Sequence, residues 1–307
     1  MYKGKSICII GLGETGVTIG ALFNHHFSNN AIHVLDPSDS VAGRLLDLQH
    51  AGAYRNNQFT WNDFSAAASA DIIFYCAGFR NAKEGDRLSL AKKNKDLIKT
   101  IFDSFVPSES AKIIVVTNPV ELITEWISEY FDGQRITVGT GTDLDTFRLK
   151  FLLAKRLNVL PFEVNVKVIG EHGDSMVPLY DSAMIKGNKL TSLLSRNELI
   201  QLTIDLKNSA KAIRKTEEAT KFGVAQCAVE IMNSFFGDQK REHIVSTQLA
   251  SYYSGLAGIS SAVFVSQPCF ISNKGLQVRN DIVLSDEEVI QFSHSVQQLI
   301  RVENENK

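Results

Sequence analysis

The chain has 307 residues, of which 44% are hydrophobic and 21% charged, with a formal net charge of −2. This is the composition of a globular protein long enough for two domains. The near-neutral charge argues against partners such as nucleic acid or an anionic membrane, and no apolar run approaches the ~18 residues of a membrane span. No spacing typical of metal ligands occurs, so we expect no metal. The four cysteines are far apart and the start lacks the apolar core of a signal peptide, which together favour a cytoplasmic protein.

The first 36 residues contain a nucleotide-binding pattern in its required context. A strand expected at 6–10 leads into G-L-G-E-T-G at 11–16, a helix follows at 17–27, and a second strand at 31–35 ends at Asp36. Asp36 lies 23 residues after Gly13, near the spacing of about 20 that dinucleotide-binding folds use. The alternative is a glycine turn in an unrelated α/β protein.

Each part of this pattern has a physical role. Gly11 permits the tight turn, Gly13 lets the backbone approach a pyrophosphate, and Gly16 lets the helix pack on the strand. The start of the helix offers free N–H groups to the phosphates. A carboxylate at Asp36 would accept hydrogen bonds from ribose hydroxyls and repel a 2′-phosphate, which favours NAD over NADP, unless Asp36 only caps the next helix.

Strands and helices continue to alternate up to about residue 140. We expect helices at 40–51, 88–105 and 120–131, and strands at 71–76, 112–116 and 135–138. This alternation predicts an α/β protein with a doubly wound parallel sheet, in which ligands bind at the carboxyl ends of the strands. Ala77, Gly78 and Asn118 follow such ends and are candidate cofactor-binding residues, and Asn118 could also bind substrate.

The pattern changes after residue 140 to α+β without a second glycine turn. Helices are expected at 144–157, 198–214, 217–236 and 285–301; strands at 164–169, 244–251 and 262–267; and turns near 186–188 and 273–275. We therefore predict a dinucleotide-binding domain over residues 1–140 and a catalytic domain over residues 141–307.

One histidine stands at the end of a buried strand in the second domain. I-G-E-H-G-D at 169–174 places His172 beside Gly173, where its ring can project into a cleft. An unperturbed pKa of about 6.5 suits histidine to proton transfer, although a turn histidine is the commoner outcome for an isolated case.

A helix just after residue 140 carries two partners for such a histidine. Asp145 and Arg148 are three residues apart and share one helix face. The carboxylate could fix the tautomer of a histidine and raise its pKa, and the guanidinium could bind a substrate carboxylate. A capping box and a surface ion pair are the simpler interpretations.

Two further segments are weaker candidates for parts of a ligand-binding site. The charged, glycine-containing stretch at 77–87 has the composition of a lid, or of a solvated loop. Thr220 follows a small residue on a predicted helix and could line a pocket, although a structural role is commoner at such a position.

The ordered motifs resemble those of the L-lactate/malate dehydrogenase family over essentially the whole chain. They are I-I-G-L-G-E-T-G, Asp36, C-A-G with Arg87, T-N-P-V, G-T-G-T-D-L-D-T-F-R and I-G-E-H-G-D. The lactate dehydrogenase branch and the L-2-hydroxyisocaproate dehydrogenases are the most similar. The resemblance implies an NAD-dependent L-2-hydroxy acid dehydrogenase that transfers hydride between NADH and a 2-oxo acid and forms homodimers or homotetramers.

The resemblance also implies a role for each matching residue. His172 is the proton donor and acceptor, Asp145 orients it, and Arg148 binds the substrate carboxylate. The other matches are Arg87, which polarises the carbonyl; Asn118, which hydrogen-bonds the substrate oxygen; and Thr220 on the pocket wall.

Two departures from the family pattern concern specificity and regulation. Asn81 occupies the position where lactate dehydrogenases usually have glutamine and malate dehydrogenases arginine, which counts against malate and favours pyruvate or a larger aliphatic 2-oxo acid. Lys150 and Asn165 occupy the positions of an arginine and a histidine that bind fructose 1,6-bisphosphate in bacterial relatives. We therefore expect that sugar phosphate to change the KM for pyruvate weakly or not at all.

Three other functions are alternatives to this interpretation of the sequence. A malate dehydrogenase is the nearest, and a catalytically silent NAD sensor would retain the fold without needing His172, Asp145, Arg148 and Arg87 together. An NAD-dependent glycosidase would need a metal-binding Cys/His pair that the sequence does not contain.

Overall fold

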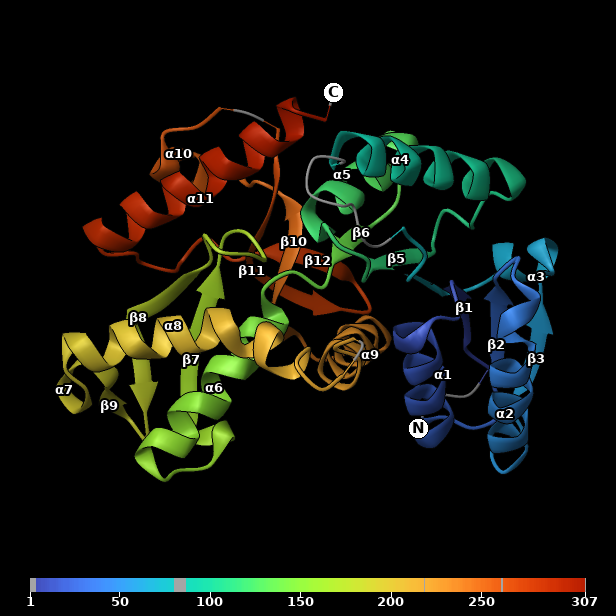
Figure 1. Cartoon of the computed structure of the whole chain (residues 1–307), viewed down its shortest axis with the longest axis horizontal. Helices are drawn as coiled ribbons and strands as arrows, with labels where there is room; N and C mark the ends of the chain where they lie inside the picture. Colours follow the sequence, from blue (N-terminus) through green and yellow to red (C-terminus); the bar gives the residue numbers. More distant parts are fainter. Residues whose placement is uncertain (1–3, 80–86, 218, 261, 307) are drawn as a thin grey trace.

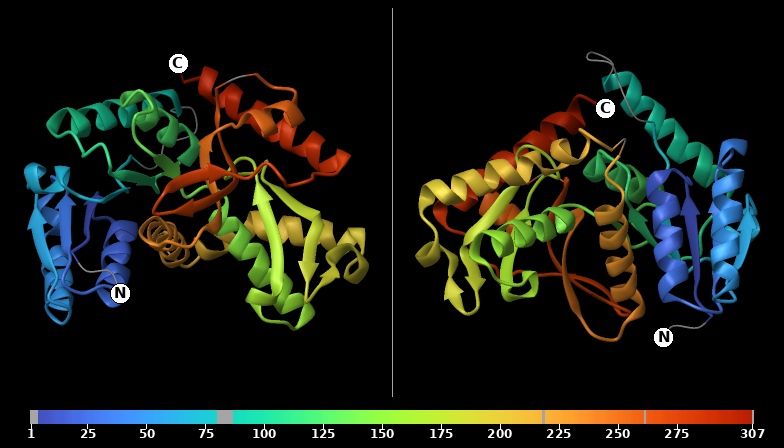
Figure 2. Two further views of the ribbon diagram at one scale, coloured as in Figure 1. Left: turned by 180° about the vertical axis from the view of Figure 1, so that it is seen from behind. Right: turned by 60° about the horizontal axis from the view of Figure 1, so that its bottom comes forward.

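The computed structural model describes residues 4–79, 87–217, 219–260 and 262–306. Within these ranges the chain builds a nine-stranded sheet in the order β12-β11-β10-β6-β5-β4-β1-β2-β3 and a smaller sheet in the order β7-β8-β9. Figures 1 and 2 show helices on both faces of the large sheet and the smaller sheet to one side of it.

The large sheet begins with six parallel strands. They are β1 (Ser6–Ile10), β2 (Ala31–Leu35), β3 (Gln58–Trp61), β4 (Ile72–Tyr75), β5 (Lys112–Val115) and β6 (Thr137–Gly139). All but β3 are mostly or wholly buried, as expected for strands covered by helices on both faces. The order 3-2-1-4-5-6 is that of a dinucleotide-binding fold, which confirms the predicted fold class.

The second half of the chain extends this sheet and adds the small one. The antiparallel strands β10 (Arg241–Gln248), β11 (Phe264–Ser272) and β12 (Gly275–Val278) join through a pairing of Ser246 with Gly139 of β6. The small sheet contains β7 (Val164–Ile169), β8 (Val177–Ile185) and β9 (Asn188–Lys189). The large sheet is therefore continuous across residue 140, where we place the domain boundary.

The helices cover both faces of the large sheet. Those of the first half are α1 (Glu14–His26), α2 (Ala42–Ala53), α3 (Phe64–Ala68), α4 (Arg87–Ser104) and α5 (Val120–Tyr130). Those of the second half are α6 (Asp143–Leu157), α7 (Leu190–Leu193), α8 (Arg196–Ile213), α9 (Phe222–Phe236), α10 (Ser251–Ala257) and α11 (Asp286–Asn304), and short 3₁₀ turns lie at Asp39–Val41 and Pro161–Glu163. One core cluster packs α1, α2 and α9 against one face of the sheet, and another packs α4 and α5 against the other.

The structure differs from the sequence prediction in a few elements. The strands β3, β8, β9 and β12 and the helices α3, α7 and α10 were not predicted, and α9 begins at Phe222 rather than at 217. The late start of α9 has a visible cause, because Lys221 has non-helical dihedral angles and its ammonium lies 3.1 Å from Glu14 on α1.

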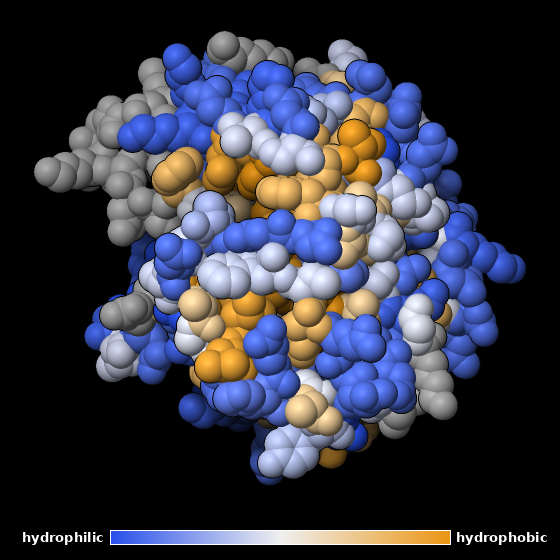
Figure 3. Space-filling model, turned by 90° about the vertical axis from the view of Figure 1, so that its right-hand side faces the viewer, coloured by the Kyte–Doolittle hydropathy of each residue, from blue (hydrophilic) through white to orange (hydrophobic). Residues whose placement is uncertain are grey.

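Some large apolar side chains stay at the surface. Phe147 and Phe151 on α6 are 50% and 60% exposed, and Phe222 at the start of α9 is 70% exposed. On the side of the molecule shown in Figure 3, apolar side chains gather in hollows between hydrophilic ridges. Apolar surface of this kind is a common feature of contacts with other molecules.

Gly16 provides a test of the turn between β1 and α1. A Cβ at Gly16 would lie 2.1 Å from the carbonyl oxygen of Gly11, whereas a Cβ at Gly43 on α2 would meet no atom within 4 Å. We expect Gly16→Ala to lower the stability by about 1–3 kcal/mol, the usual cost of forcing extra volume into a packed site. Gly43→Ala is the matched control and should leave the melting temperature unchanged or raise it, because alanine is the better helix former. Equal melting temperatures for the two variants would contradict this packing.

Candidate active site

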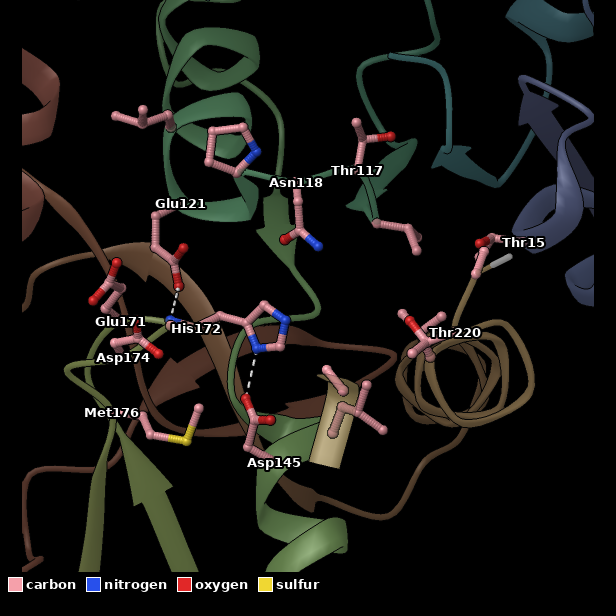
Figure 4. A pocket seen from close by; sticks show the side chains of 18 of the residues that line it. Thr15, Thr117, Asn118, Glu121, Asp145, Glu171, His172, Asp174, Met176 and Thr220 are labelled. Atoms are coloured by element: carbon pink, nitrogen blue, oxygen red, sulfur yellow. Dashed lines mark hydrogen bonds and ion pairs between the residues drawn. The ribbon is translucent and has the colours of Figure 1, made fainter. Parts of the chain in front are cut away.

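A cleft of about 630 Å³ lies between the carboxyl ends of the parallel strands and the second half of the chain. Its volume is within the range of about 300–1,000 Å³ that small-molecule sites occupy. Thr15, Gly78, Asn118, Asp145, His172 and Thr220 all line it, and Figure 4 shows most of these side chains around one space. The cleft therefore brings together candidate residues from both halves of the sequence.

His172 follows β7 on a turn that is held at three successive residues. Gly170 has a positive φ of 92° and pairs with Ser266 of β11, and the N–H of Glu171 donates to the Ser295 hydroxyl at 2.8 Å. The N–H of His172 itself donates to Oε1 of Glu121 at 2.9 Å. This backbone is consequently fixed before any ligand enters.

Asp145 lies between His172 and Arg148 and contacts each with a different carboxylate oxygen. Its Oδ2 is 2.5 Å from Nδ1 of His172, and its Oδ1 accepts a hydrogen bond of 2.9 Å from the Arg148 guanidinium. The Asp145 side chain has no solvent exposure, whereas those of His172 and Arg148 are 21% and 14% exposed. Because Asp145 holds Nδ1, the Nε2 atom of the ring is the one left to meet a ligand in the cleft (Figure 4).

The helix that carries Asp145 is fastened to the strand that precedes His172. The hydroxyl of Thr142 donates to the carbonyl oxygen of Val168, and the N–H of Val168 donates to the Thr146 hydroxyl at 3.0 Å. All three residues are buried. These contacts fix the separation of α6 and β7, and therefore that of Asp145 and His172.

The contacts determine the charges of this group. Burial disfavours an imidazolium at His172, but the attraction and hydrogen bond of Asp145 outweigh burial, so the pKa of His172 is raised. Burial also favours a neutral Asp145, but His172 and Arg148 prevail and lower the pKa of Asp145. Asp145 is therefore ionised near neutral pH, and His172 carries a proton more often than a free histidine does.

The sequence analysis did not identify Glu121 as a site residue. It is buried on α5, and its Oε1 accepts hydrogen bonds from the His172 N–H and from the Ser266 hydroxyl, the latter at 3.2 Å. Burial raises the pKa of Glu121, against the opposing effect of His172. Its only sequence signal is an acid in an apolar helix directly after T-N-P-V, which does not reveal its partner.

The nucleotide-binding turn has the geometry that the sequence predicts. Gly11 has a φ of 90° and lies against the backbone of Ala77, and a Cβ at Gly13 would meet nothing within 4 Å. Gly13 caps α1 without a side-chain hydrogen bond, so no capping side chain occupies the first N–H groups of the helix. Asp36 ends β2 and accepts hydrogen bonds from the N–H groups of Leu12 and Ser38 at 2.8 and 3.0 Å.

These features fit a dinucleotide. The turn leaves room for a pyrophosphate next to Gly13, and the end of β2 presents the carboxylate that a ribose would contact. The acid in the turn, Glu14, is compensated by Arg44 at 2.8 Å and Lys221 at 3.1 Å, which limits its repulsion of phosphate. The sequence analysis missed these two ion pairs, because their members are 30 and 207 residues apart.

The other residues predicted to belong to the site lie either in the cleft or outside the described part of the chain. Gly78, Asn118 and Thr220 line the cleft, and the Asn118 side chain points into it beside His172 (Figure 4). Asn81 lies outside the described residues, and so does the side chain of Arg87, whose backbone begins α4.

The two positions considered for sugar-phosphate binding lie on neighbouring elements of the second half. Asn165 is an exposed residue of β7 and Lys150 is a partly buried residue of α6, where burial lowers the pKa of the Lys150 ammonium. The adjacent Lys167 forms an ion pair with Glu242 at 3.2 Å.

The described part of the chain contains neither a metal-binding cluster of side chains nor a helix that could span a membrane. Over residues 4–79, 87–217, 219–260 and 262–306, no group of three or more His, Cys, Asp or Glu side chains is arranged to hold a metal ion. In the same ranges, every helix is too short or too polar to span a bilayer.

Comparison with known protein families assigns both halves of the chain. Residues 5–136 match the NAD-binding domain of lactate/malate dehydrogenases, and residues 142–307 match the α/β C-terminal domain of the same proteins. The chain belongs to the lactate/malate dehydrogenase family, which confirms the resemblance seen in its motifs. It is accordingly an NAD-dependent 2-hydroxy acid dehydrogenase.

Individual relatives agree with this assignment over nearly the full length. An L-lactate dehydrogenase 2 of Peribacillus psychrosaccharolyticus is 30% identical over 94% of this chain and 92% of its own. An L-lactate dehydrogenase 1 of Staphylococcus aureus is 28% identical over 97% and 96%. The crystal structure of a minor L-lactate dehydrogenase from Enterococcus mundtii, 24% identical, superposes with a TM-score of 0.89 over 99% of both chains and so shares the fold.

The Asp145–His172 contact can be tested by titration. We expect Asp145→Asn to lower the pKa of His172, because the substitution removes the negative charge that outweighs burial. The measurement is an NMR titration of the histidine ring carbons. Asp47→Asn, which neutralises an exposed carboxylate on α2, is the control and should not move the His172 signal. A His172 pKa that stays the same or rises in Asp145→Asn would refute the contact.

Proposed function

We propose that this protein reversibly reduces a 2-oxo acid to the L-2-hydroxy acid, with NADH as hydride donor, in the manner of L-lactate dehydrogenases. The observation that supports the proposal most strongly is the arrangement of His172, Asp145 and Arg148 in one cleft with the nucleotide-binding edge. An acid–base group, its charge partner and a carboxylate-binding cation are the groups that this reaction requires. A catalytically silent NAD sensor would have no use for all three.

The substrate would be oriented through its carboxylate. Arg148 uses one guanidinium nitrogen for Asp145 and keeps donors available for a ligand in the cleft. Asn118, whose side chain points into the cleft beside His172 (Figure 4), would donate to the substrate oxygen. Holding the acid at both points would fix its carbonyl next to His172.

The proton would come from His172. Bound NADH supplies the hydride, and the protonated Nε2 of His172 donates its proton to the oxygen that becomes the hydroxyl. Asp145 stabilises the imidazolium before transfer and keeps the ring in position afterwards. In the reverse direction the neutral ring accepts the hydroxyl proton. Arg87, which opens α4, is proposed to polarise the carbonyl during the same step.

The residues that would hold the cofactor are those of the first domain. Gly11, Gly13 and Gly16 shape the pyrophosphate site, and Asp36 would bind the adenosine ribose. Ala77, Gly78 and Asn118 at the ends of the next strands would line the path of the nicotinamide half. Together with the absence of a base in the four residues after Asp36, this set supports NAD rather than NADP.

For the substrate side chain we propose pyruvate or a larger aliphatic 2-oxo acid. Asn81 carries no charge to pair with the second carboxylate of oxaloacetate, and it is shorter than the glutamine that usually occupies its position. Thr220 would form the adjoining wall of the pocket. Malate dehydrogenase activity is the alternative that this choice excludes. We place the reaction in the cytoplasm, consistent with four free cysteines, three of them buried.

The reaction is tested with a substrate panel and one variant. Purified protein should oxidise NADH with pyruvate or 4-methyl-2-oxopentanoate faster than with oxaloacetate. His172→Ala should lower kcat by about 10²–10⁴, the usual contribution of a general acid, while binding of NADH measured by fluorescence is retained. Preferred turnover of oxaloacetate would refute the substrate choice, and an unchanged kcat in His172→Ala would refute the mechanism.

We further propose that the protein forms a homodimer or homotetramer. The exposed Phe147, Phe151 and Phe222 support this, because a second copy of the chain could cover them. Sedimentation equilibrium should give two or four times the mass of the 34.0 kDa chain. A monomer at micromolar concentration would contradict the proposal.

A further inference from the structure

One wall of the cleft carries three basic side chains that the proposed reaction does not use. Lys207, Lys211 and Arg214 all line it, together with Leu206 and Ala210 from the same segment. Their spacing of four and then three residues puts them on one face of α8 and its last turn. Lys207 also lines a second groove, which shares several lining residues with the cleft.

These three cations have no carboxylate partner among the described residues. None of the ion pairs within 4–79, 87–217, 219–260 and 262–306 includes Lys207, Lys211 or Arg214. The Arg214 guanidinium reaches only the carbonyl oxygen of Ala210 in its own helix, at 3.4 Å. By contrast, Arg148 in the same cleft and Lys221 just before α9 both form ion pairs. The row is therefore free to meet a ligand.

The acids that share the cleft do not cancel this charge. Asp145 is matched by Arg148 and His172. Glu171 accepts hydrogen bonds from the hydroxyl and N–H of Ser175, the N–H at 3.2 Å, and Asp174 is exposed to solvent. The fourth acid of the lining, Glu121, is buried and accepts hydrogen bonds from the His172 N–H and the Ser266 hydroxyl. Three unpaired cations and the two carboxylates of Glu171 and Asp174 therefore leave an excess of positive charge on this side of the cleft.

Apolar side chains complete the region around the basic row. Met176, Leu206, Leu299 and Val302 line the cleft near it. A ligand held by its carboxylate at Arg148 would therefore extend an aliphatic chain past apolar surface, with the cations of α8 available to its far end. Arg148 belongs to α6, whereas the row belongs to α8 and the turn that follows it.

We infer that the cleft favours 2-oxo acids whose aliphatic side chain ends in a second carboxylate, two or three methylene groups beyond the carbonyl carbon. This inference rests on the proposed function, and it names Lys207, Lys211 and Arg214 as specificity-determining residues. The hydride still goes to the carbonyl carbon and the proton of His172 to its oxygen, and the distal carboxylate takes no part in bond making. These acids differ from oxaloacetate, which has a single methylene group, in the length of the chain between the two carboxylates.

The size of the expected substrate preference depends on how far the three cations are exposed to solvent. Lys211 and Arg214 are exposed and Lys207 is half-buried, so each contact is screened by water. Exposed ion pairs are individually weak, and a combination of them gives a preference of about three- to tenfold. Added salt should reduce it further, because exposed charges are screened.

The simplest rival explanation is that these residues only stabilise the end of α8. Cations near the C-terminus of a helix interact favourably with its dipole. Lys215 lies at the same helix end and is exposed, but it does not line the cleft. Lys215 is consequently the matched control, because it can stabilise the end of α8 but does not line the cleft where the ligand would bind.

The test compares acids of equal chain length with and without the distal charge. The ratio of kcat/KM for 2-oxoglutarate to that for 2-oxopentanoate, and for 2-oxoadipate to 2-oxohexanoate, should exceed one by about three- to tenfold in the wild type. The double variant Lys211→Gln/Arg214→Gln should lose most of this preference, and Lys215→Gln should keep it. If the double variant has a lower melting temperature than the wild type, Lys211→Gln alone should lose a smaller part of the preference.

The outcomes separate the two proposals. Reduction of the neutral acids with ratios at or below one overturns this inference and leaves the proposed function standing. A preference for the dicarboxylic acids that is equal in the wild type and the double variant also overturns this inference, because the charge on α8 would then have no effect. The proposed function would again stand. A wild-type protein that reduces none of the four acids, nor pyruvate, overturns the proposed function and this inference with it.

Discussion

The site depends on the buried carboxylate of Asp145, which contacts His172 with one oxygen and Arg148 with the other. An ionised carboxylate without solvent exposure is costly unless its charge is compensated, and these two cations provide the compensation. The same contacts raise the pKa of His172 and fix its ring. The acid–base group and the carboxylate-binding group are thus held by one interaction, and removal of Asp145 would affect both.

The fold brings these groups together through pairings across the two halves of the chain. The bridge between Gly170 and Ser266 ties the end of β7 to the large sheet, and Glu121 connects α5 to the backbone of His172. The helix α9 packs on α1, while Lys221 just before it pairs with Glu14 in the nucleotide-binding turn. The cofactor edge and the acid–base group are therefore parts of one packed unit.

Local patterns made much of this structure predictable. The strands β1, β2 and β7 have the bounds that their buried apolar runs predict, and the strand–glycine–helix signal placed the nucleotide-binding turn correctly. Asp145 and Arg148 were recognisable as a pair because a helix brings residues three apart to one face. The edge strand β3 was missed because it is only partly buried and has no continuous apolar run.

Contacts between segments that are far apart in the sequence could not be predicted from local patterns. Glu121 meets the backbone of His172 across 51 residues, and nothing near either residue indicates the other. The row of Lys207, Lys211 and Arg214 is indistinguishable in sequence from an ordinary solvated helix face. Only the placement of α8 beside the cleft gives these cations a ligand-binding role.

The proton-transfer role of His172 is tested most directly by the pH dependence of kcat/KM in both directions. Because reduction uses the protonated ring, we expect its rate to be constant at low pH and to fall as the pH rises through the raised pKa of His172. Oxidation of the hydroxy acid uses the neutral ring and should show the opposite dependence, with the same apparent pKa. Profiles that change in the same direction for both reactions, or a reduction rate that increases with pH, would contradict this role for His172.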